Sequence, residues 1–358
     1  MAELQAVWGW QPALYLFLGG LSAGTFVTAA LLFFKDRERN ARVVRIACWA
    51  ALVCLAAGLG LLLTELSNPL RGMMMWQSFS NFASWMTIGA WALALAMVVF
   101  GLMALLSTPA VARRLGAEAG RGAAIDRVRR VLAVAGSALA LVVAAYTGIL
   151  LMAAPGVPLW NTLLLPCLFT VSGLDTGVAL VEVIAVAIKA GVAPASSRLL
   201  SRCVAVLVVA ELVVLAVFLG LAAAGGAGVE SVFAAAGAQL MLGGPLAPAF
   251  WLLVVVLGLA LPLAVAVMQL RRGGAGEPVR GSASAAKGTA GGEKTASSAT
   301  EEKQPVAASS PAMEEKKPGH GLALAGACGA LVGGCALRFI ILSAGVHGDV
   351  IGALVSSL

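Results

Sequence analysis

Residues 43–66 read VVRIACWAALVCLAAGLGLLLTEL, an apolar run with one arginine near its start and one glutamate near its end. A helix of about 20 mostly apolar residues crosses the hydrocarbon core of a bilayer, which is about 30 Å thick. The run does not alternate between polar and apolar residues as a barrel strand does, so only a helix satisfies its backbone in lipid. The segment therefore predicts a transmembrane helix.

Seven other runs of similar length repeat this pattern along the chain. Together the eight predicted spans are residues 12–34, 43–66, 82–106, 131–153, 164–188, 203–223, 250–268 and 321–345. A ninth apolar stretch, residues 231–242, is too short to span, and we interpret it as an interfacial or re-entrant piece. The predicted fold is all-α, a polytopic membrane protein built as an eight-transmembrane-helix bundle.

The composition excludes a soluble protein. The chain has 358 residues, of which 60% are hydrophobic and only 11% charged, and its mean hydropathy is +0.96. Soluble domains carry about 25% charged residues. The net charge of +7 does not indicate nucleic acid as a partner, because the basic residues lie between apolar runs instead of covering a polar surface.

Lysine and arginine fall in alternate loops, which predicts the topology. They follow the first, third, fifth and seventh runs, whereas the other loops contain Arg71 alone. Because cytoplasmic loops carry the excess of basic residues, these four loops are predicted to be cytoplasmic and both termini to face outward. The first run is a full span without a basic segment before it, so no cleavable signal peptide is expected.

The chain divides into three predicted parts. Residues 1–272 hold transmembrane helices 1–7, and residues 320–358 hold helix 8 and an outward C-terminus. Residues 273–319 between them are rich in Gly, Ala, Ser, Thr, Glu and Lys without apolar periodicity, which is typical of a disordered loop. We expect this cytoplasmic loop to be dispensable for the chemistry.

Cysteine and histidine are arranged unfavourably for metal centres. The six cysteines form no CxxC pair, so neither a zinc site nor an iron–sulfur cluster is expected in this chain. The two histidines, His320 and His347, would lie about 40 Å apart in a helix and cannot jointly ligate a haem. Any redox role is therefore expected to work without haem, iron–sulfur cluster or other metal inside this chain.

Ionisable side chains inside the apolar runs are candidates for function, because each costs about 2.5 to 3.5 kcal/mol to place near the bilayer centre. Asp175 and Glu182 lie on one face of the fifth predicted helix, and Arg338 is expected to find a carboxylate partner across the bundle. Two interpretations stay open: a buried ion pair that fixes helix register, or a proton path. The five candidates for a functional role are Glu65, Asp175, Glu182, Glu211 and Arg338. All of them except Glu65 belong to the predicted proton path.

The chain has only two tyrosines, and the predicted topology places both near the outer face. Tyr15 begins the first helix and Tyr146 lies in the outer half of the fourth, at a depth similar to that of Glu65. Phenols donate hydrogen bonds to a quinone carbonyl, and a carboxylate accepts the proton of a quinol. Tyr15 also fits an interfacial aromatic belt, and a transporter could also keep acidic residues at mid-depth.

Six strings, each on a predicted helix or at its end, carry a resemblance to a known family. They are WGWQPALYLFLGGLSAG (8–24), TELSNPLRG (64–72), YTGILL (146–151), SGLDTGVAL (172–180), LGGPLAPAFW (242–251) and GGCALRFIILSAG (333–345). In this order the chain resembles the NrfD/PsrC family, the membrane subunit of the polysulfide-reductase type. The similarity covers all eight spans and omits the low-complexity loop.

The resemblance implies a haem-free subunit that exchanges electrons with menaquinone or ubiquinone in the bacterial inner membrane. It implies an extrinsic four-cluster iron–sulfur subunit on the outer face and a molybdopterin or cytochrome catalytic subunit, which handles the terminal substrate. Tyr146 matches the family's tyrosine in the YTG string, and Tyr15 stands where relatives carry histidine. Glu65 keeps the acid of the family's Asp-Leu-Gly-Arg-Pro string, whereas its arginine is replaced and Arg71 follows later.

Without internal redox carriers, electrons pass from quinol directly to an external cluster, which confines the quinone site to the outer side. Two alternatives are a structural anchor without quinone chemistry and a proton-coupled transporter. The transporter is disfavoured because no pair of corresponding helices is broken by Gly and Pro as in an inverted repeat, although Pro262 interrupts the seventh helix.

Overall fold

A computed structural model describes residues 3–4, 9–65, 85–115, 122–154, 156–189, 194–225, 229–274 and 319–347. The elements in sequence order are β1 (Glu3–Leu4), α1 (Trp10–Lys35), α2 (Arg37–Glu65), α4 (Trp85–Leu106), α5 (Pro109–Arg114), α6 (Gly122–Met152), α7 (Leu164–Ala187), α8 (Pro194–Ala224), α9 (Val229–Leu242), α10 (Ala247–Ala249), the π-helix η3 (Phe250–Ala260), α11 (Leu261–Gly274), α12 (Gly319–Ser343) and β2 (Val346–His347).

Eight helical segments among these residues are long and apolar enough to cross a membrane, which confirms the eight predicted spans and the all-α class. Several helices begin well before the predicted apolar run: α2 begins at Arg37, α6 at Gly122 and α8 at Pro194. Arginine and alanine have high helix propensity, so these helices extend beyond the N-terminal end of the apolar run. The ninth stretch is α9, a helix shorter than a span, as predicted.

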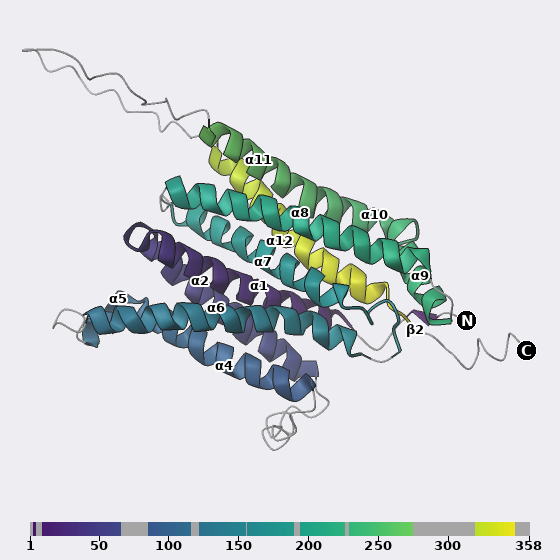
Figure 1. The fold of residues 1–358 in the computed structure, drawn as a ribbon, viewed down its shortest axis with the longest axis horizontal. Coiled ribbons are helices and arrows are strands. Elements are labelled where there is room, and N and C mark those ends of the chain that lie inside the picture. Colours follow the sequence, from purple (N-terminus) through teal and green to yellow (C-terminus); the bar gives the residue numbers. More distant parts are fainter. Residues whose placement is uncertain are drawn as a thin grey trace, which may run out of the picture.

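The spans form two rings of four helices (Figure 1). In the first ring α1, α2, α4 and α6 pack as successive neighbours, and in the second α7, α8, α11 with η3, and α12 do the same. The rings join where α1 packs against α7 and α12 and where α6 packs against α7. A site between the rings therefore draws on α1, α7 and α12.

Glycines bring the backbones of the two rings together. A Cβ atom on Gly24 of α1 would overlap the Gly173 carbonyl of α7, and one on Gly177 would overlap the Gly24 backbone. Inside the second ring, Gly333 of α12 lies against Gly258 of η3 in the same way. Because glycine has no side chain, the helices at these positions pack closely.

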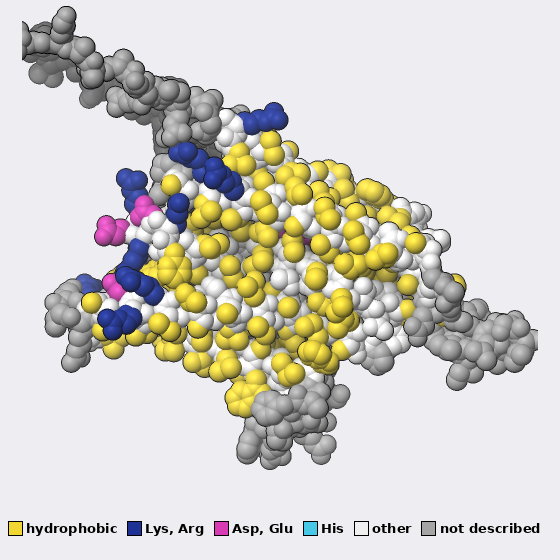
Figure 2. Space-filling view, in the orientation of Figure 1, with side chains coloured by type: hydrophobic (Ala, Val, Ile, Leu, Met, Phe, Trp, Pro, Cys, Tyr) yellow, Lys and Arg dark blue, Asp and Glu magenta, His cyan; other side chains and the backbone are white. Residues whose placement is uncertain are grey.

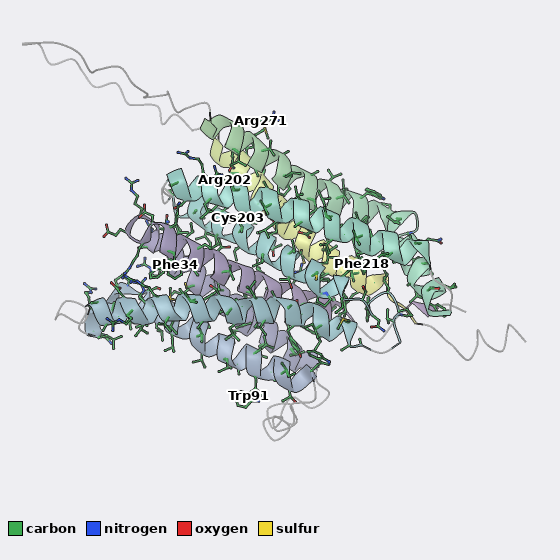
Figure 3. The ribbon with its side chains drawn as sticks, in the orientation of Figure 1. Phe34, Trp91, Arg202, Cys203, Phe218 and Arg271 are labelled. Carbon is green, nitrogen blue, oxygen red and sulfur yellow. The ribbon has the colours of Figure 1, made fainter. Side chains whose placement is uncertain are left out.

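Apart from the buried Arg338, the described lysines and arginines gather at one end of the bundle, and apolar side chains cover most of the rest of the visible face (Figure 2). We call this the cationic end and the opposite one the far end. Arg202 of α8 and Arg271 of α11 lie toward the cationic end, whereas Phe218 lies toward the far end (Figure 3). The predicted clustering of basic residues on one side of the spans is confirmed, and the chain is a multi-pass membrane protein.

The first of two further features was not expected from the sequence, whereas the second lies at Pro262, which was predicted to interrupt the seventh span. Strand β1 pairs antiparallel with β2, Glu3 opposite His347 and Leu4 opposite Val346, which ties the N-terminus to the segment after α12 at the far end (Figure 1). The seventh span changes from π to α geometry at Leu261, next to Pro262, which has no backbone N–H to donate. Residues 275–318, most of the predicted disordered loop, lie outside the described residues.

Candidate functional site

The predicted site residues fall into two groups in different rings. Tyr15 on α1, Tyr146 on α6 and Glu65 at the end of α2 belong to the first ring. The acidic residues of α7 and α8 belong to the second ring, and Arg338 reaches from α12 to the boundary between the rings. The acids of the second ring are Asp175, Glu182 and Glu211.

The two tyrosines lie at one depth near the far end. Helices α1 and α6 pack against each other and run in opposite directions, with Tyr15 near the start of α1 and Tyr146 near the end of α6. A Cβ atom on Gly19 would lie 3.2 Å from Cγ2 of Thr147, which places the turn after Tyr15 beside the residue after Tyr146. The depth predicted from the alternating loops is confirmed relative to the bundle.

The ring of Tyr146 is half-buried and lies over Gly89 of α4. Any Cβ atom at position 89 would overlap the phenol ring and its hydroxyl, so only glycine leaves this space. No residue in the described part of the chain hydrogen-bonds to the Tyr146 hydroxyl. Among the described residues, packing against Gly89 therefore fixes the position of the phenol. Sequence reasoning missed Gly89, whose only signal is a glycine in an apolar run.

Glu65 is the last residue of α2. A Cβ atom on Gly58 of the same helix would lie 3.5 Å from the Tyr15 carbonyl oxygen, so α2 passes the tyrosine level there. Glu65 follows roughly 10 Å further along the helix, toward the far end, so the prediction that it shares the depth of the two tyrosines is wrong: α2 passes their level at Gly58 and continues for two more turns. Its side chain and Arg71 lie outside the described residues.

Arg338 is fully buried between the rings. Its Nη1 donates to Oγ of Ser172 at 3.1 Å and to the Gly334 carbonyl at 2.7 Å, and its Nη2 donates to the Phe169 carbonyl at 3.3 Å. Its guanidinium carbon lies 5.7 Å from the ring centroid of Phe17 and 5.1 Å from that of Phe169. A cation is thus held one to two turns below the tyrosine level, with neutral partners in direct contact.

The carboxylate partner expected for Arg338 is present, but not as a direct ion pair. Among the described residues no carboxylate oxygen lies within 4.0 Å of the guanidinium. Glu211 borders the same small cavity as Ser172 and interacts electrostatically with Arg338. Ser172, which accepts a hydrogen bond from Arg338, therefore lies close to both charged groups. A direct ion pair was the expectation; the two groups are kept apart because α7 passes between α8 and α12.

Asp175 continues the polar contacts from Glu211. It is 2% exposed, interacts electrostatically with both Glu211 and Glu182, and its Oδ1 has no hydrogen-bond partner among the described residues. Asp175 borders two small cavities, one shared with Ser172 and Glu211 and one shared with Glu182. A buried carboxyl oxygen facing a cavity is a position where a water molecule completes the hydrogen bonding.

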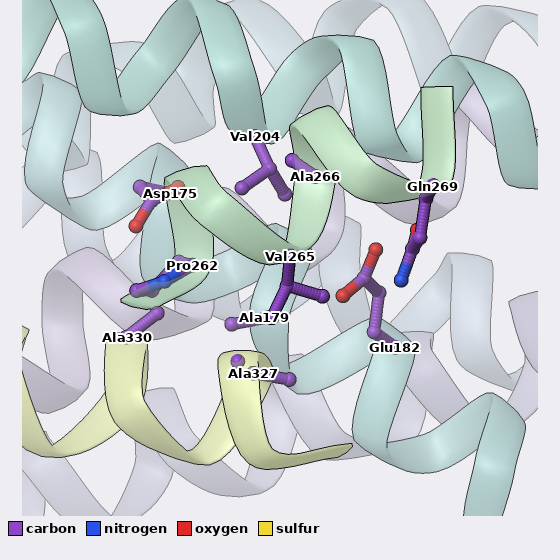
Figure 4. A pocket seen from close by; sticks show the side chains of 11 residues that line it. Asp175, Ala179, Glu182, Val204, Pro262, Val265, Ala266, Gln269, Ala327 and Ala330 are labelled. Atoms are coloured by element: carbon purple, nitrogen blue, oxygen red, sulfur yellow. The ribbon is translucent and has the colours of Figure 1, made fainter. Parts of the chain in front are cut away.

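Figure 4 shows the second cavity, with Asp175 at one end and Glu182 facing Gln269 at the other. The cavity is narrow and has room for roughly one water molecule. Beyond it, Ser201 donates to Oε1 of Gln269 at 2.5 Å. Sequence reasoning missed Ser172, Ser201 and Gln269, which cost little to bury.

We call the whole series the polar file: Arg338, Ser172, Glu211, Asp175, Glu182, Gln269 and Ser201.

The polar file runs from the boundary of the rings toward the cationic end. Helix α7 runs in that direction from Ser172 to Glu182, and Ser201 lies near the start of α8, which begins at the cationic end. Its side chains come from α7, α8, α11 and α12, and Asp175 and Glu182 lie two helical turns apart on α7. The part of the chain that the structure describes contains no group of three His, Cys, Asp or Glu residues that could hold a metal ion.

The comparisons with known proteins show the family. The family model described as polysulphide reductase, NrfD, matches residues 2–276. The C subunit of polysulfide reductase from Wolinella succinogenes is 32% identical over 274 residues, which cover 73% of this protein and 83% of the relative. Protein NrfD of Escherichia coli K12 is 32% identical over 271 residues, which cover 72% of this protein and 83% of the relative. This chain belongs to the NrfD family of polysulphide reductases.

Proposed function

We propose that this chain is the quinone-reactive membrane subunit of a bacterial respiratory oxidoreductase. It exchanges electrons between membrane quinol or quinone and an extrinsic iron–sulfur subunit, and it anchors the complex without acting on the terminal substrate. The observation that carries the proposal is the Tyr146 hydroxyl, which is positioned over Gly89 near the far end and has no hydrogen-bond partner among the described residues.

The residues near the far end fit a quinone. Tyr146 offers a phenol donor for a carbonyl oxygen, Tyr15 lies at the same depth, and the exposed apolar side chains of α4 suit a ring and an isoprenoid tail. Menaquinone or ubiquinone bound there would supply two-electron chemistry coupled to protons. Glu65, further toward the far end on α2, is the proposed acceptor of the quinol proton.

The orientation and partners follow from the same proposal. With the cationic end in the cytoplasm, the far end and both termini face outward from the inner membrane. The far end is then the docking side for a four-cluster iron–sulfur subunit, which in turn carries a molybdopterin or cytochrome catalytic subunit. One relative is named as a component of polysulfide reductase, which supports a role within a multi-subunit reductase.

Purification through a tag on this chain tests the proposal directly. An iron–sulfur subunit is expected to co-purify, and a quinol analogue is expected to reduce its clusters, followed by electron paramagnetic resonance. A complex whose clusters stay oxidised with quinol present would favour the anchor without quinone chemistry. Solute uptake by the purified protein without partners would favour the transporter.

Substitution of Gly89 tests the position of the phenol. Gly89→Val places a branched side chain where the Tyr146 ring lies, so the ring must move and quinol turnover is expected to fall several-fold while the complex still assembles. Gly101→Val is the matched control on the same helix, since a Cβ atom there has no neighbour within 4 Å. Equal turnover in both variants contradicts the assigned position.

The polar file supplies a proposed proton route from the level of Arg338 to the cytoplasm, which makes turnover electrogenic. Glu182→Gln removes an ionisable group at the cavity that Glu182 shares with Asp175. It is expected to lower the membrane potential formed during turnover to less than half of that formed by the unmodified complex. The potential is measured with a voltage-sensitive dye in vesicles that contain the whole complex. Glu38→Gln, at an exposed carboxylate of the cationic end, is the control. An unchanged potential in Glu182→Gln refutes the route.

A further inference from the structure

Two arginines from different helices share one aromatic ring at the cationic end, away from the polar file. The guanidinium carbon of Arg37 on α2 lies 5.3 Å from the ring centroid of Phe33, and that of Arg129 on α6 lies 5.0 Å from it. Phe33 itself is buried. The ring therefore fixes two cations within a short distance of each other.

One carboxylate serves both arginines. Asp126 forms an ion pair with Arg37, and the same Oδ1 lies 3.9 Å from Nη1 of Arg129. Arg130 adds a third positive charge, which repels Arg37 electrostatically, and Glu38 adds a second negative charge, which attracts it. Three arginines against two carboxylates leave a net positive charge, and a further anion would relieve the repulsion among the arginines.

The hydrogen bonding of Arg129 is also incomplete. Its Nη2 lies 3.5 Å from Oγ of Ser107, and its buried Nε has no hydrogen-bond partner among the described residues. The Arg129 side chain is 15% exposed and that of Arg37 34%, so neither guanidinium is sealed inside the bundle. Partly exposed guanidiniums with an excess of positive charge favour an acceptor that carries negative charge.

The surroundings place this acceptor at the edge of the membrane. Phe34 next to the ring is 52% exposed, and Val128 and Val131 on α6 are 48% and 61% exposed. Trp49 of α2 is also exposed and donates to Oγ1 of Thr108 at 3.1 Å, in the way that tryptophan lies at a membrane interface. A ligand here has its charge at the arginines and its apolar part against these side chains.

We propose that Arg37, Arg129, Phe33 and Asp126 form a binding site for the phosphate of an anionic membrane lipid, and we call these four residues the arginine site. A headgroup phosphate accepts two parallel hydrogen bonds from a guanidinium, and the acyl chains cover the exposed apolar side chains beside it. The site lies between α1, α2 and α6 and would tie these helices together at the cationic end.

Thermal unfolding of the delipidated full-length protein in detergent tests the lipid. Phosphatidylglycerol is expected to raise the Tm, whereas phosphatidylcholine at the same mole fraction is not. Inorganic phosphate at millimolar concentration is expected to have little effect, because it lacks the acyl chains. If phosphate alone raises the Tm as much as phosphatidylglycerol does, the ligand is a free anion and the lipid assignment is overturned.

Two variants test the residues. Arg129→Gln is expected to remove most of the rise in Tm, whereas Arg127→Gln, at an exposed arginine of the same helix, keeps it. Asp126→Asn removes the competing carboxylate, so it is expected to lower the concentration of phosphatidylglycerol that gives half of the rise several-fold. A purely structural cluster predicts the opposite pattern: Asp126→Asn lowers the Tm without lipid and leaves the lipid response unchanged, which overturns the proposal.

Discussion

Replacing Tyr146 with phenylalanine is expected to reduce quinol turnover by about tenfold to a hundredfold while the complex remains assembled. The substitution removes one hydroxyl and keeps the ring over Gly89, so packing of α4 against α6 is preserved. A hydrogen bond to a group that carries or develops charge is worth roughly 1.5 to 3 kcal/mol, which corresponds to that range of rate. Turnover is measured with a quinol analogue and the purified complex.

The matched control for this substitution is Ser137→Ala on the same helix. The Ser137 hydroxyl donates to the Ala133 carbonyl of its own helix at 2.7 Å, so its loss removes a hydroxyl without touching the phenol. Turnover in Ser137→Ala is expected to equal that of the unmodified complex. If Tyr146→Phe also turns over at the unmodified rate, the protein is an anchor without quinone chemistry at this position.

Much of the fold follows from the sequence, because the hydrophobic requirement of a bilayer acts on each span separately. A run such as residues 43–66 is long enough to cross by itself, whatever it packs against. The alternating basic loops then order the spans in depth, which is why Tyr15 and Tyr146 could be placed at one level before α1 and α6 were known to be neighbours.

The site is less predictable, because periodicity fixes the face of a residue on its own helix and not the neighbour that this face meets. Gly89 opens the space for Tyr146 from another helix, and nothing in the α4 sequence distinguishes it from Gly101. Ser172 and Gln269 cost little to bury, so hydropathy does not reveal them. Their roles appear only once α7, α8, α11 and α12 surround the same space.

Arg338→Met is expected to destabilise the protein by at least about 1 to 3 kcal/mol, the usual cost of leaving a buried hydrogen-bond acceptor without its donor. Methionine keeps an unbranched side chain of similar length, so most of the packing between Phe17 and Phe169 is retained. What is lost is the cation that donates to Ser172 and interacts electrostatically with Glu211. A large fall in Tm in detergent is the expected result, whereas Arg202→Met, at an exposed arginine of the cationic end, should change it little.

A double-mutant cycle separates the charge from the packing. In a Glu211→Gln background the buried carboxyl group that needs the cation is gone, so Arg338→Met is expected to cost clearly less than in the unmodified protein. Equal costs in the two backgrounds would mean that Ser172 does not couple the two groups, and the polar file would then end at Glu211. Because Phe17 lies on α1 two positions after Tyr15 and its ring packs against the guanidinium, Arg338 also connects the tyrosine level to the polar file.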